Sequence, residues 1–450
     1  MKTIFITILQ GVEAKNILRT DIYRRLIAEP DLRLVLLVNS QEKKVFYERE
    51  FHHERASYEV LPICPASPSE RFFSALKFKL IANETFDLRR RMRRDETGRY
   101  IAAAMDWLVN RLVARRAVRR IVRWLDYHIV RQSFLRPLFE RHQPSAVFLA
   151  HLFDDLEVAI LREALRRGIP SVGFINSWDK LTARAILRLL PGRLAVFNDI
   201  VRHEAEELAD MPAEKIFVGG MPHYDCYVTH QPSRRESFCR ALGADPSKRL
   251  VVYAPNGKYS AKADGVMIDF LHSAIAGGAI RYAELLGRFQ PNHVVDRAEI
   301  EKRPWLIYDI PGIRFSPERG IDWDMGPADT QRLIDTLTHA AVLICYTSSL
   351  SVDAAACGKP VININFELEP IQKLSSSPIQ YYHMTHYQKA LSSGGIRVVS
   401  SPEELLAWIN RYLENPGLDE AGRKRLVHEQ CGRLEGRSGR RIAEYILAAL

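Results

Sequence analysis

Three consecutive hydroxyl residues, Thr347, Ser348 and Ser349, stand between an apolar run at 341–346 and a short apolar helix predicted to start near residue 352. Ser is a preferred helix N-cap, and the N–H groups and positive dipole end of a helix start attract anions. At the carboxyl edge of a parallel sheet, such a turn favours a diphosphate. An ordinary helix cap in an α/β domain has the same pattern.

The residues around this turn predict a βαβ unit. The run at 341–346 suits a strand that is buried on both faces, and Gly358 and Pro360 end the helix that follows it. A second apolar run at 361–366 then predicts the next parallel strand. Asp353, one turn into the helix, could bind ribose hydroxyls or could simply complement the helix dipole.

Two cations lie near the ends of further predicted strands. Lys258 follows the strand at 250–254, and Arg288 lies near the end of the strand at 282–289. Arg presents a fork that matches phosphate oxygens, and Lys presents a point charge. With the hydroxyl-rich turn, they could neutralise a diphosphate leaving group without a metal. We expect no metal site and no cofactor.

Asp179 and His151 are the candidates for proton transfer, because each follows a predicted strand. Either side chain could act as general base toward an acceptor hydroxyl. Asp179 could instead cap a helix beginning near Thr182. His151 could be oriented by Asp154 or Asp155, or could be a solvated loop residue.

The chain has 450 residues, of which 47% are hydrophobic and 26% are charged, as in a folded protein with two domains. No apolar run approaches the roughly 20 residues that span a bilayer, and the N-terminal residues predict a first strand, not a signal peptide. Six scattered cysteines without metal spacing indicate a cytoplasmic protein.

A basic, helical insertion is predicted at 66–141. Between Arg71 and Arg141 there are 18 Lys and Arg against 7 Asp and Glu, although the whole chain has a net charge of only +10. Beside an apolar stripe, a basic stripe recurs every four residues: Arg111, Arg115, Arg119 and Arg123. The basic stripe could contact an anionic membrane or a polyanionic acceptor, or could be a solvated face. The aromatic residues follow no nucleic-acid-binding motif, so we expect no nucleic acid partner.

The predicted fold class is α/β, with two Rossmann-like domains facing each other across a cleft. Ligands bind at the carboxyl edges of such sheets. The predicted parts are an N-terminal acceptor domain at 1–228 with its insertion, a connector at 229–249, a donor-binding domain at 250–432, and a C-terminal helix at 433–450 that packs back on the N-terminal domain.

Several motifs over residues 145–450 resemble bacterial GT-B-fold transferases, in particular CDP-glycerol glycerophosphotransferase-like and surface-polysaccharide glycosyltransferase families. The insertion matches no such pattern. The motifs are G-x-P-x-x-D at Gly220, Pro222 and Asp225, Y-A-P at Tyr253–Pro255, R-x-x-P at Arg288 and Pro291, S-S-x-x-x-D-A-A-x-x-G-K-P-V-I at Ser348–Ile362, and the segment Tyr381, Tyr382, Thr385, His386 and Tyr387.

The resemblance implies roles for individual residues. Ser348, Ser349 and Arg288 would lie near the donor phosphates, Asp353 near the ribose, and His386 on a loop near the donor. The chain departs from the family pattern at two positions. Where the family usually has R-x-H-P, this chain has Arg288-Phe-Gln-Pro, so Gln replaces the His. Asp353 stands where the family usually has Glu.

We therefore expect a metal-independent glycosyltransferase that moves a sugar from a nucleotide-activated donor to a cell-envelope glycan or a lipid-linked acceptor, on the cytoplasmic side and in contact with the inner face of the membrane. The alternatives are a CDP-glycerol-type glycerophosphotransferase, a nucleotide-sugar 2-epimerase, and a non-catalytic scaffold that binds glycan or membrane.

Overall fold

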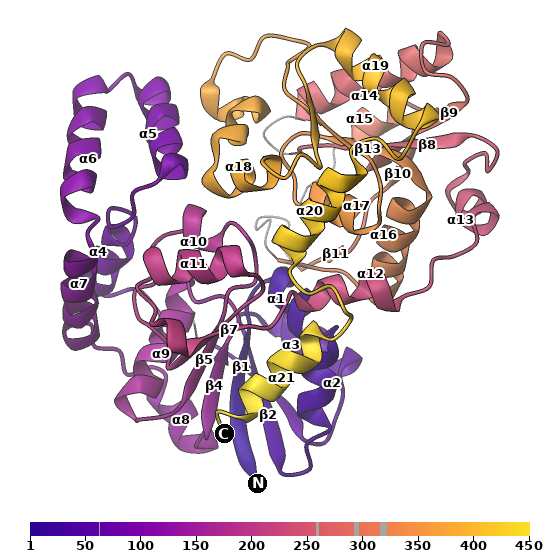
Figure 1. Cartoon of the computed structure of the whole chain (residues 1–450). Helices are drawn as coiled ribbons and strands as arrows, with labels where there is room; N and C mark the ends of the chain where they lie inside the picture. Colours follow the sequence, from indigo (N-terminus) through magenta and orange to yellow (C-terminus); the bar gives the residue numbers. More distant parts are fainter. Residues whose placement is uncertain (63, 258–260, 292–296, 316–321) are drawn as a thin grey trace. The chain divides into compact units, whose positions relative to one another are not determined.

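The computed structural model describes residues 1–62, 64–257, 261–291, 297–315 and 322–450 (Figure 1). Its chain divides into two compact units. The first comprises Met1–Arg91, Arg99–Asp225 and Gly432–Leu450, and the second comprises Met92–Gly98 and Cys226–Cys431. Each unit contains its own parallel sheet, which confirms the prediction of two Rossmann-like α/β domains.

The sheet of the first unit has seven strands, all parallel, in the order β3-β2-β1-β4-β5-β6-β7. Its strands are short and mostly apolar, and all but the two partly buried edge strands are buried on both faces, as in other parallel sheets covered by helices. They are β1 (Lys2–Ile8), β2 (Leu32–Val38), β3 (Ala56–Val60), β4 (Ala146–Leu149), β5 (Ser171–Phe174), β6 (Arg193–Val196) and β7 (Ile216–Val218).

Short helices connect these strands, and most begin at a residue that caps them. Ser40, Asp154 and Asn198, for example, accept a hydrogen bond from a first-turn N–H. The helices are α1 (Gly11–Ile17), α2 (Asp21–Ile27), α3 (Gln41–Glu50), α9 (Asp155–Arg166), α10 (Lys180–Ala183) and α11 (Asp199–Glu207), with 3-10 turns η1 (Ala213–Lys215) and η2 (Pro222–Asp225).

The predicted insertion between β3 and β4 is helical, as expected. It contains α4 (Pro68–Leu76), α5 (Glu84–Thr97), α6 (Tyr100–Val113), α7 (Arg116–Ile129) and α8 (Arg136–His142). The last helix of the chain, α21 (Ser438–Leu447), returns to the first unit and packs against α2. Gly439 permits this close approach, because a Cβ there would lie 3.0 Å from the Asp21 nitrogen.

The main sheet of the second unit has six parallel strands in the order β10-β9-β8-β13-β14-β15. A two-stranded antiparallel pair, β11 and β12, accompanies it. The strands are β8 (Arg249–Ala254), β9 (Ala283–Arg288), β10 (Ile307–Asp309), β11 (Ile313–Arg314), β12 (Trp323–Asp324), β13 (Ala340–Cys345), β14 (Val361–Ile364) and β15 (Arg397–Val399).

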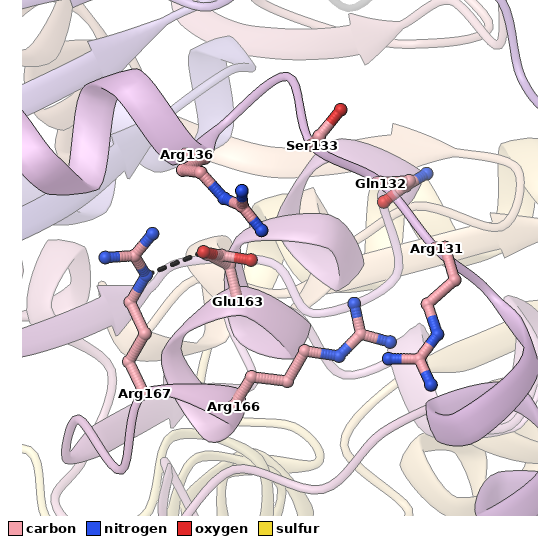
Figure 2. A pocket seen from close by; sticks show the side chains of 7 residues that line it. All are labelled: Arg131, Gln132, Ser133, Arg136, Glu163, Arg166 and Arg167. Carbon is pink, nitrogen blue, oxygen red and sulfur yellow. Dashed lines mark hydrogen bonds and ion pairs between the residues drawn. The ribbon is translucent and has the colours of Figure 1, made fainter.

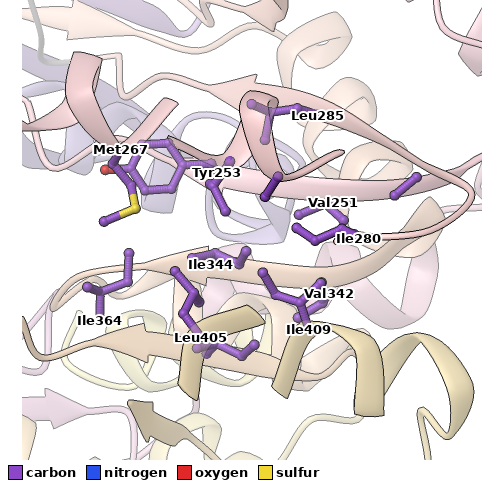
Figure 3. Packing of buried hydrophobic residues seen from close by; sticks show 14 of the residues in the cluster. Val251, Tyr253, Met267, Ile280, Leu285, Val342, Ile344, Ile364, Leu405 and Ile409 are labelled. Atoms are coloured by element: carbon purple, nitrogen blue, oxygen red, sulfur yellow. The ribbon is translucent and has the colours of Figure 1, made fainter. Parts of the chain in front are cut away.

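Helices cover this second sheet, and Figure 3 shows the core beneath two of them. Met267 of α14 and Leu405 of α19 pack in one cluster with Ile344 of β13, so both helices lie on the same face of the sheet. The helices are α12 (Cys226–Thr229), α13 (Arg235–Leu242), α14 (Ala261–Ala276), α15 (Arg297–Glu301), α16 (Pro327–His339), α17 (Leu350–Ala356), α18 (Thr385–Leu391), α19 (Pro402–Glu414) and α20 (Glu420–Cys431), with 3-10 turns η3 (Leu374–Ser376) and η4 (Pro378–His383).

Both sheets have the strand order of a Rossmann fold. In each sheet, the second and third strands are added on one side of the first strand. The fourth strand, β4 or β13, then pairs with the other side of the first. The order therefore reverses between β1 and β4 in the first sheet and between β8 and β13 in the second. Ligands of such sheets bind outside the carboxyl ends of the strands at this reversal.

Candidate functional site

The reversal point of the first sheet is built around the buried carboxylate of Glu157, in the first turn of α9. Its oxygens accept hydrogen bonds from the backbone N–H of Ala150 (3.1 Å) and of His151 (2.9 Å), and also from Leu152 N and Thr7 Oγ1. These bonds tie the carboxyl ends of β1 and β4 together. Burial raises the pKa of Glu157 to about 7, although the hydrogen bonds act against the rise.

A second buried carboxylate, Glu13 of α1, lies close to the first. It accepts a hydrogen bond from Gln10 N at 3.1 Å and another from Leu9 N. Burial, and then repulsion from Glu157, raise the pKa of Glu13 well above its usual value. Lys180 of α10 is 3% exposed beside these acids, and burial lowers its pKa to about 8. The edge thus holds one acid, Glu157, and one base, Lys180, whose pKa values lie near neutrality, as in proton-transfer sites.

The predicted residue His151 lies at this same edge, directly after β4. It is 5% exposed, and neither of its ring nitrogens has a hydrogen-bond partner among the described residues. Burial, followed by the positive charges of Lys180 and Arg184, lowers its pKa well below 6.5. The imidazole is therefore neutral at neutral pH, with a nitrogen able to accept a proton.

The expectation that Asp154 or Asp155 orients this histidine is wrong. Asp154 caps α9 by accepting a hydrogen bond from Leu156 N at 2.9 Å. Asp155 forms an ion pair with Lys77 at 2.9 Å and accepts a hydrogen bond from Ser74 at 2.7 Å. Asp154 therefore caps α9, and Asp155 connects α9 to the insertion.

Asp179 lies after β5, on the same edge of the first sheet. Its side chain is 26% exposed. The Ser177 hydroxyl donates to it at 2.6 Å, and Arg184 Nε lies 3.9 Å from it. Asp179 occupies the N-cap position of α10, but its side chain accepts no hydrogen bond from that helix. The carboxylate is therefore not committed to capping.

The reversal point of the second sheet contains the predicted hydroxyl-rich turn, Thr347–Ser349. Thr347 and Ser348 are half-buried, and Ser349 is exposed. Ser348, not Ser349, caps the following helix, because its hydroxyl accepts a hydrogen bond from Leu350 N at 3.2 Å. The N–H of Ser348 donates to the hydroxyl of Tyr387 at 3.2 Å.

A buried polar network holds this turn in place. The Tyr387 hydroxyl donates to Asn363 Oδ1 at 2.6 Å, and the Asn363 amide donates to the carbonyl of Tyr346 at 3.2 Å and to the hydroxyl of Ser351 at 3.2 Å. Tyr387, Asn363 and Ser351 come from α18, β14 and α17, so the network connects three elements at one turn. Such a network fixes a single loop conformation.

The remaining predicted donor residues have different surroundings. Asp353 is 6% exposed in α17, near Cys357 and Cys431. Burial of the two thiols is the main reason that their pKa values are raised, and the negative charge of Asp353 raises them further. His386 is 8% exposed in α18. Lys258 lies outside the described residues.

Arg288 is buried at the end of β9 and forms an ion pair with Asp309. Arg332 of α16 also reaches Asp309, at 3.3 Å, and its side chain is 42% exposed. Burial, and then the charge of Arg332, lower the pKa of Arg288 to about 10, so the guanidinium stays charged at neutral pH. The structure thus pairs the predicted cation with an acid and adds a more exposed cation beside it.

Sequence reasoning missed Glu13, Glu157, Lys180 and Arg332. Glu13 and Glu157 lie in the first turns of helices, where an acid is usually explained by the helix dipole. Lys180 directly follows Asp179 in the sequence, and this neighbour was the signal that could have placed Lys180 at the carboxyl edge of the sheet.

The predicted basic stripe needs a correction. Arg119 and Arg123 are not on the surface: both are buried, at 7% and 8% exposure, and both form ion pairs with Asp210 at 2.6 Å. Arg111 is exposed but donates to Asp87, and Arg115 is exposed. The four arginines therefore do not form one surface, because half of them anchor α7 to the domain.

Two features are absent from the described part of the chain. No group of three or more His, Cys, Asp or Glu side chains there is arranged to hold a metal ion. None of the described helices is long and apolar enough to cross a membrane.

The fold is similar to that of several solved enzymes. UDP-GlcNAc 2-epimerase from Neisseria meningitidis bound to UDP-GlcNAc matches with a TM-score of 0.56 at 11% identity, covering 100% of both chains. A glycosyltransferase from Rickettsia africae matches with a TM-score of 0.51 at 11% identity, covering 99% of this chain and 98% of that one. A variant of the wall teichoic acid polymerase TagF matches with a TM-score of 0.52 at 11% identity, covering 99% and 88%.

No family model and no curated protein sequence matches the chain. At these identities the structural likeness establishes the fold alone. The chain has a GT-B fold, as its motifs predict, and the reaction has to be argued from the residues at its two reversal points.

Proposed function

We propose that the protein is a metal-independent glycosyltransferase that moves a sugar from a nucleotide-activated donor to a hydroxyl of a cell-envelope glycan or a lipid-linked acceptor. The observation that carries this proposal is the contrast between the two Rossmann reversal points. One holds ionisable groups suited to proton transfer, and the other holds hydroxyl, amide and guanidinium groups suited to a diphosphate. The neighbouring structures support it, since they include a glycosyltransferase and epimerases named for UDP-GlcNAc.

In this reaction the acceptor hydroxyl loses its proton to a base, and its oxygen forms a bond to the anomeric carbon. The bond between that carbon and the diphosphate breaks, and the nucleoside diphosphate leaves with the electron pair. The protein must therefore supply a proton acceptor and must stabilise the negative charge that develops on the leaving group.

We assign the base to Asp179, with His151 as the second candidate. Asp179 is 26% exposed and can be reached by an acceptor hydroxyl, whereas His151 is 5% exposed. A neutral imidazole that lacks a described hydrogen-bond partner is nevertheless able to bind and orient a substrate hydroxyl. Lys180 interacts with both residues, since the charge of Asp179 acts to raise the pKa of Lys180 and the charge of Lys180 acts to lower the pKa of His151.

We assign the donor diphosphate to the turn Thr347–Ser349 and to the cations near the end of β9 in the same domain, Arg288 and Arg332. The turn is preorganised by Tyr387 and Asn363, so little ordering is needed when a ligand binds. Both arginines pair with Asp309, and Arg332 also pairs with Asp329. Arg332 would nevertheless approach the phosphates more readily, because its side chain is 42% exposed whereas Arg288 is buried.

A nucleotide panel tests the donor assignment. Thermal unfolding is recorded with UDP, CDP, GDP, TDP and CMP. A ligand at one hundred times its Kd stabilises the folded state by about 2.7 kcal/mol, which is a measurable shift of the melting temperature. Absence of stabilisation by every nucleotide would remove the basis of the proposal. Turnover of CDP-glycerol, and not of nucleotide sugars, would assign the protein to the glycerophosphotransferases.

A nucleotide-sugar 2-epimerase is the second candidate, because Glu13 and Glu157 are buried acids with raised pKa values beside Lys180. Epimerisation must break and re-form a C–H bond, which requires groups that exchange protons near neutral pH. The two reactions are separated by incubating UDP-GlcNAc in D2O without an acceptor. An epimerase incorporates deuterium into the sugar, whereas a transferase leaves the sugar unlabelled and needs an acceptor.

A further inference from the structure

Helix α6 of the insertion turns its polar side chains toward the domain. The amide of Asn110, which is fully buried, donates to the carbonyls of Lys79 (2.7 Å) and Ile81 (2.8 Å). Asp106, one turn earlier, accepts a hydrogen bond from Arg90 at 2.9 Å and another from Lys79. These contacts fix which side of α6 faces inward.

The large apolar side chains of α6 consequently face solvent. Their spacing of three and four residues places most of them on one stripe of the helix. They are Ile101 (80% exposed), Met105 (62%), Trp107 (47%), Leu108 (55%), Val109 (47%) and Leu112 (54%).

The next helix, α7, is likewise held by polar side chains on its inner side. Arg119 and Arg123 point inward to Asp210, and Asp126 points inward to Arg162 at 2.7 Å. Its exposed side chains include Ile121 (59%), Trp124 (60%) and Ile129 (51%). We call the exposed apolar residues of α6 and α7 the apolar face. An exposed apolar surface of this extent marks an interaction site.

An arginine-rich pocket of about 410 Å³ adjoins the end of α7. Figure 2 shows it with its lining residues, which are Arg131, Gln132, Ser133, Arg136, Glu163, Arg166 and Arg167. Arg166 joins the pocket to α7, because its guanidinium donates to the carbonyls of Tyr127 (2.8 Å) and Val130 (2.7 Å).

The charge of this pocket is strongly positive. Four guanidinium groups accompany one carboxylate, Glu163, which accepts a hydrogen bond from Arg167 at 2.6 Å (Figure 2). The guanidinium groups of Arg131 and Arg136 are exposed and make no hydrogen bond or ion pair with any described residue. The pocket therefore presents donors that suit the oxygens of a phosphate.

The surroundings of the apolar face are basic as well. Residues 100–136 contain eight Arg and two Asp. Both acids, Asp106 and Asp126, pair with cations of the domain. The outward charges of this segment are therefore those of arginines. An apolar face with tryptophans and an arginine border has the composition that binds at the surface of an anionic bilayer.

We propose that the apolar face of α6 and α7 docks on an anionic phospholipid bilayer and that the Arg131–Arg136–Arg166 pocket binds the phosphate of one lipid headgroup. The tryptophans and aliphatic side chains enter the boundary between headgroups and acyl chains, and the arginines stay at the headgroup level. This inference does not depend on the proposed reaction, since it uses none of the residues assigned to it.

Co-sedimentation of the full-length protein with vesicles tests this proposal. Vesicles of phosphatidylcholine with phosphatidylglycerol are compared with vesicles of phosphatidylcholine alone. We expect binding to the anionic vesicles only. The double variant Trp107→Ser, Leu108→Ser should lower the partition coefficient by more than about tenfold. The double variant Arg131→Glu, Arg136→Glu should lower it by about thirtyfold, because each basic residue near the surface contributes about fivefold.

Matched controls use exposed residues elsewhere. Tyr282 is 85% exposed and Arg425 is exposed, so Tyr282→Ser and Arg425→Glu make comparable changes outside the apolar face. Both should bind vesicles as the wild type does. Thermal unfolding of each variant verifies that it is folded, which is expected because all the changed side chains are on the surface.

Several results would overturn the proposal. One is absence of wild-type binding to anionic vesicles, and another is unchanged binding by both double variants. Binding of inorganic phosphate to the pocket without binding of vesicles would assign the arginines to a soluble anion. A dimer in solution that Trp107→Ser, Leu108→Ser dissociates would show that a second copy of the chain covers the apolar face.

Discussion

The carboxyl edges of the two sheets share the same strand order around the reversal and differ in the side chains placed there. At the first edge the side chains that meet are ionisable and buried: Glu13, Glu157, His151 and Lys180. At the second edge, the groups around the turn Thr347–Ser349 are neutral hydrogen-bonding groups of Tyr387, Asn363 and Ser351. One buried carboxylate, Asp264, is present as well, and it accepts hydrogen bonds from backbone N–H groups that follow β8. One Rossmann framework can thus be adapted to proton transfer or to anion binding by the residues placed after its strands.

The physical origin of the difference is burial of charge. Desolvation moves the pKa values of Glu157 and Lys180 to about 7 and about 8, so small changes in their surroundings alter their protonation. In the second edge, burial raises the pKa of the Tyr387 hydroxyl far above the physiological range. That hydroxyl stays neutral and serves as a fixed hydrogen-bonding group.

The largest expected effect concerns the first edge. Asp179→Asn should reduce turnover by about 100-fold to 10,000-fold, because it removes the proposed general base. The affinity for the nucleotide should not change, since Asp179 belongs to the other domain. Turnover with a nucleotide sugar and an acceptor, together with nucleotide titration, measures both quantities.

Asp199→Asn is the matched control, because Asp199 is an exposed acid in the first turn of α11 of the same domain. It should retain wild-type turnover. Full turnover by Asp179→Asn would transfer the role of base to His151, provided that His151→Gln is inactive. Full cellular function with both variants would indicate the non-catalytic scaffold.

The second edge should respond differently, through stability and ligand affinity. Tyr387→Phe removes the donor to Asn363 and the acceptor for Ser348 N, and it should destabilise the protein by about 1–3 kcal/mol. Weaker nucleotide binding should accompany this loss, because the turn is no longer held. Denaturant unfolding and nucleotide titration are the measurements.

Tyr308→Phe provides the comparison, since Tyr308 is 44% exposed in the same domain. It should be close to wild type in both assays. If Tyr387→Phe bound nucleotides as tightly as Tyr308→Phe does, the hydroxyl network would not be part of the donor site.

The smallest effect is a pH dependence at the first edge. Burial lowers the pKa of His151 in the folded state, so the unfolded state binds a proton at higher pH than the folded state does. Stability from this group is therefore lost as the pH falls below about 6.5, by at most about 1.4 kcal/mol per pH unit. His151→Gln should lose less stability between pH 7 and pH 5.5 than the wild type.

Denaturant unfolding at both pH values measures this difference, and His203→Gln serves as the control because the His203 side chain is 66% exposed. Equal acid sensitivity of His151→Gln and the wild type would mean that the imidazole is not desolvated. The opposing titration of Glu157 is common to both proteins and cancels in the comparison.

Strong apolar runs made most of the fold predictable. The strands expected at 341–346 and 361–366 correspond to β13 (Ala340–Cys345) and β14 (Val361–Ile364) in the structure. The weaker run at 41–50 was not predicted, and it forms α3, whose apolar and polar residues show little helical segregation. A helix without a clear apolar stripe gives no periodic pattern to detect.

The candidate site was only partly predictable, for a physical reason that the insertion illustrates. In α6 and α7 the apolar and basic stripes have the same helical spacing, so the sequence does not indicate which stripe faces inward. The choice depends on Asp210, which lies 87 residues beyond Arg123 and pairs with it. Likewise, nothing near Glu157 in the sequence shows that Thr7 will meet it from the first strand.

The central claim is that a nucleoside diphosphate binds at the reversal point of the second sheet. Hydrogen–deuterium exchange of the full-length protein, with and without the nucleoside diphosphate that stabilises it most, tests this claim directly. We expect slower exchange over residues 346–352 and over the start of α18, which holds Tyr387. Protection confined to other segments, or no protection by any nucleoside diphosphate, would contradict it.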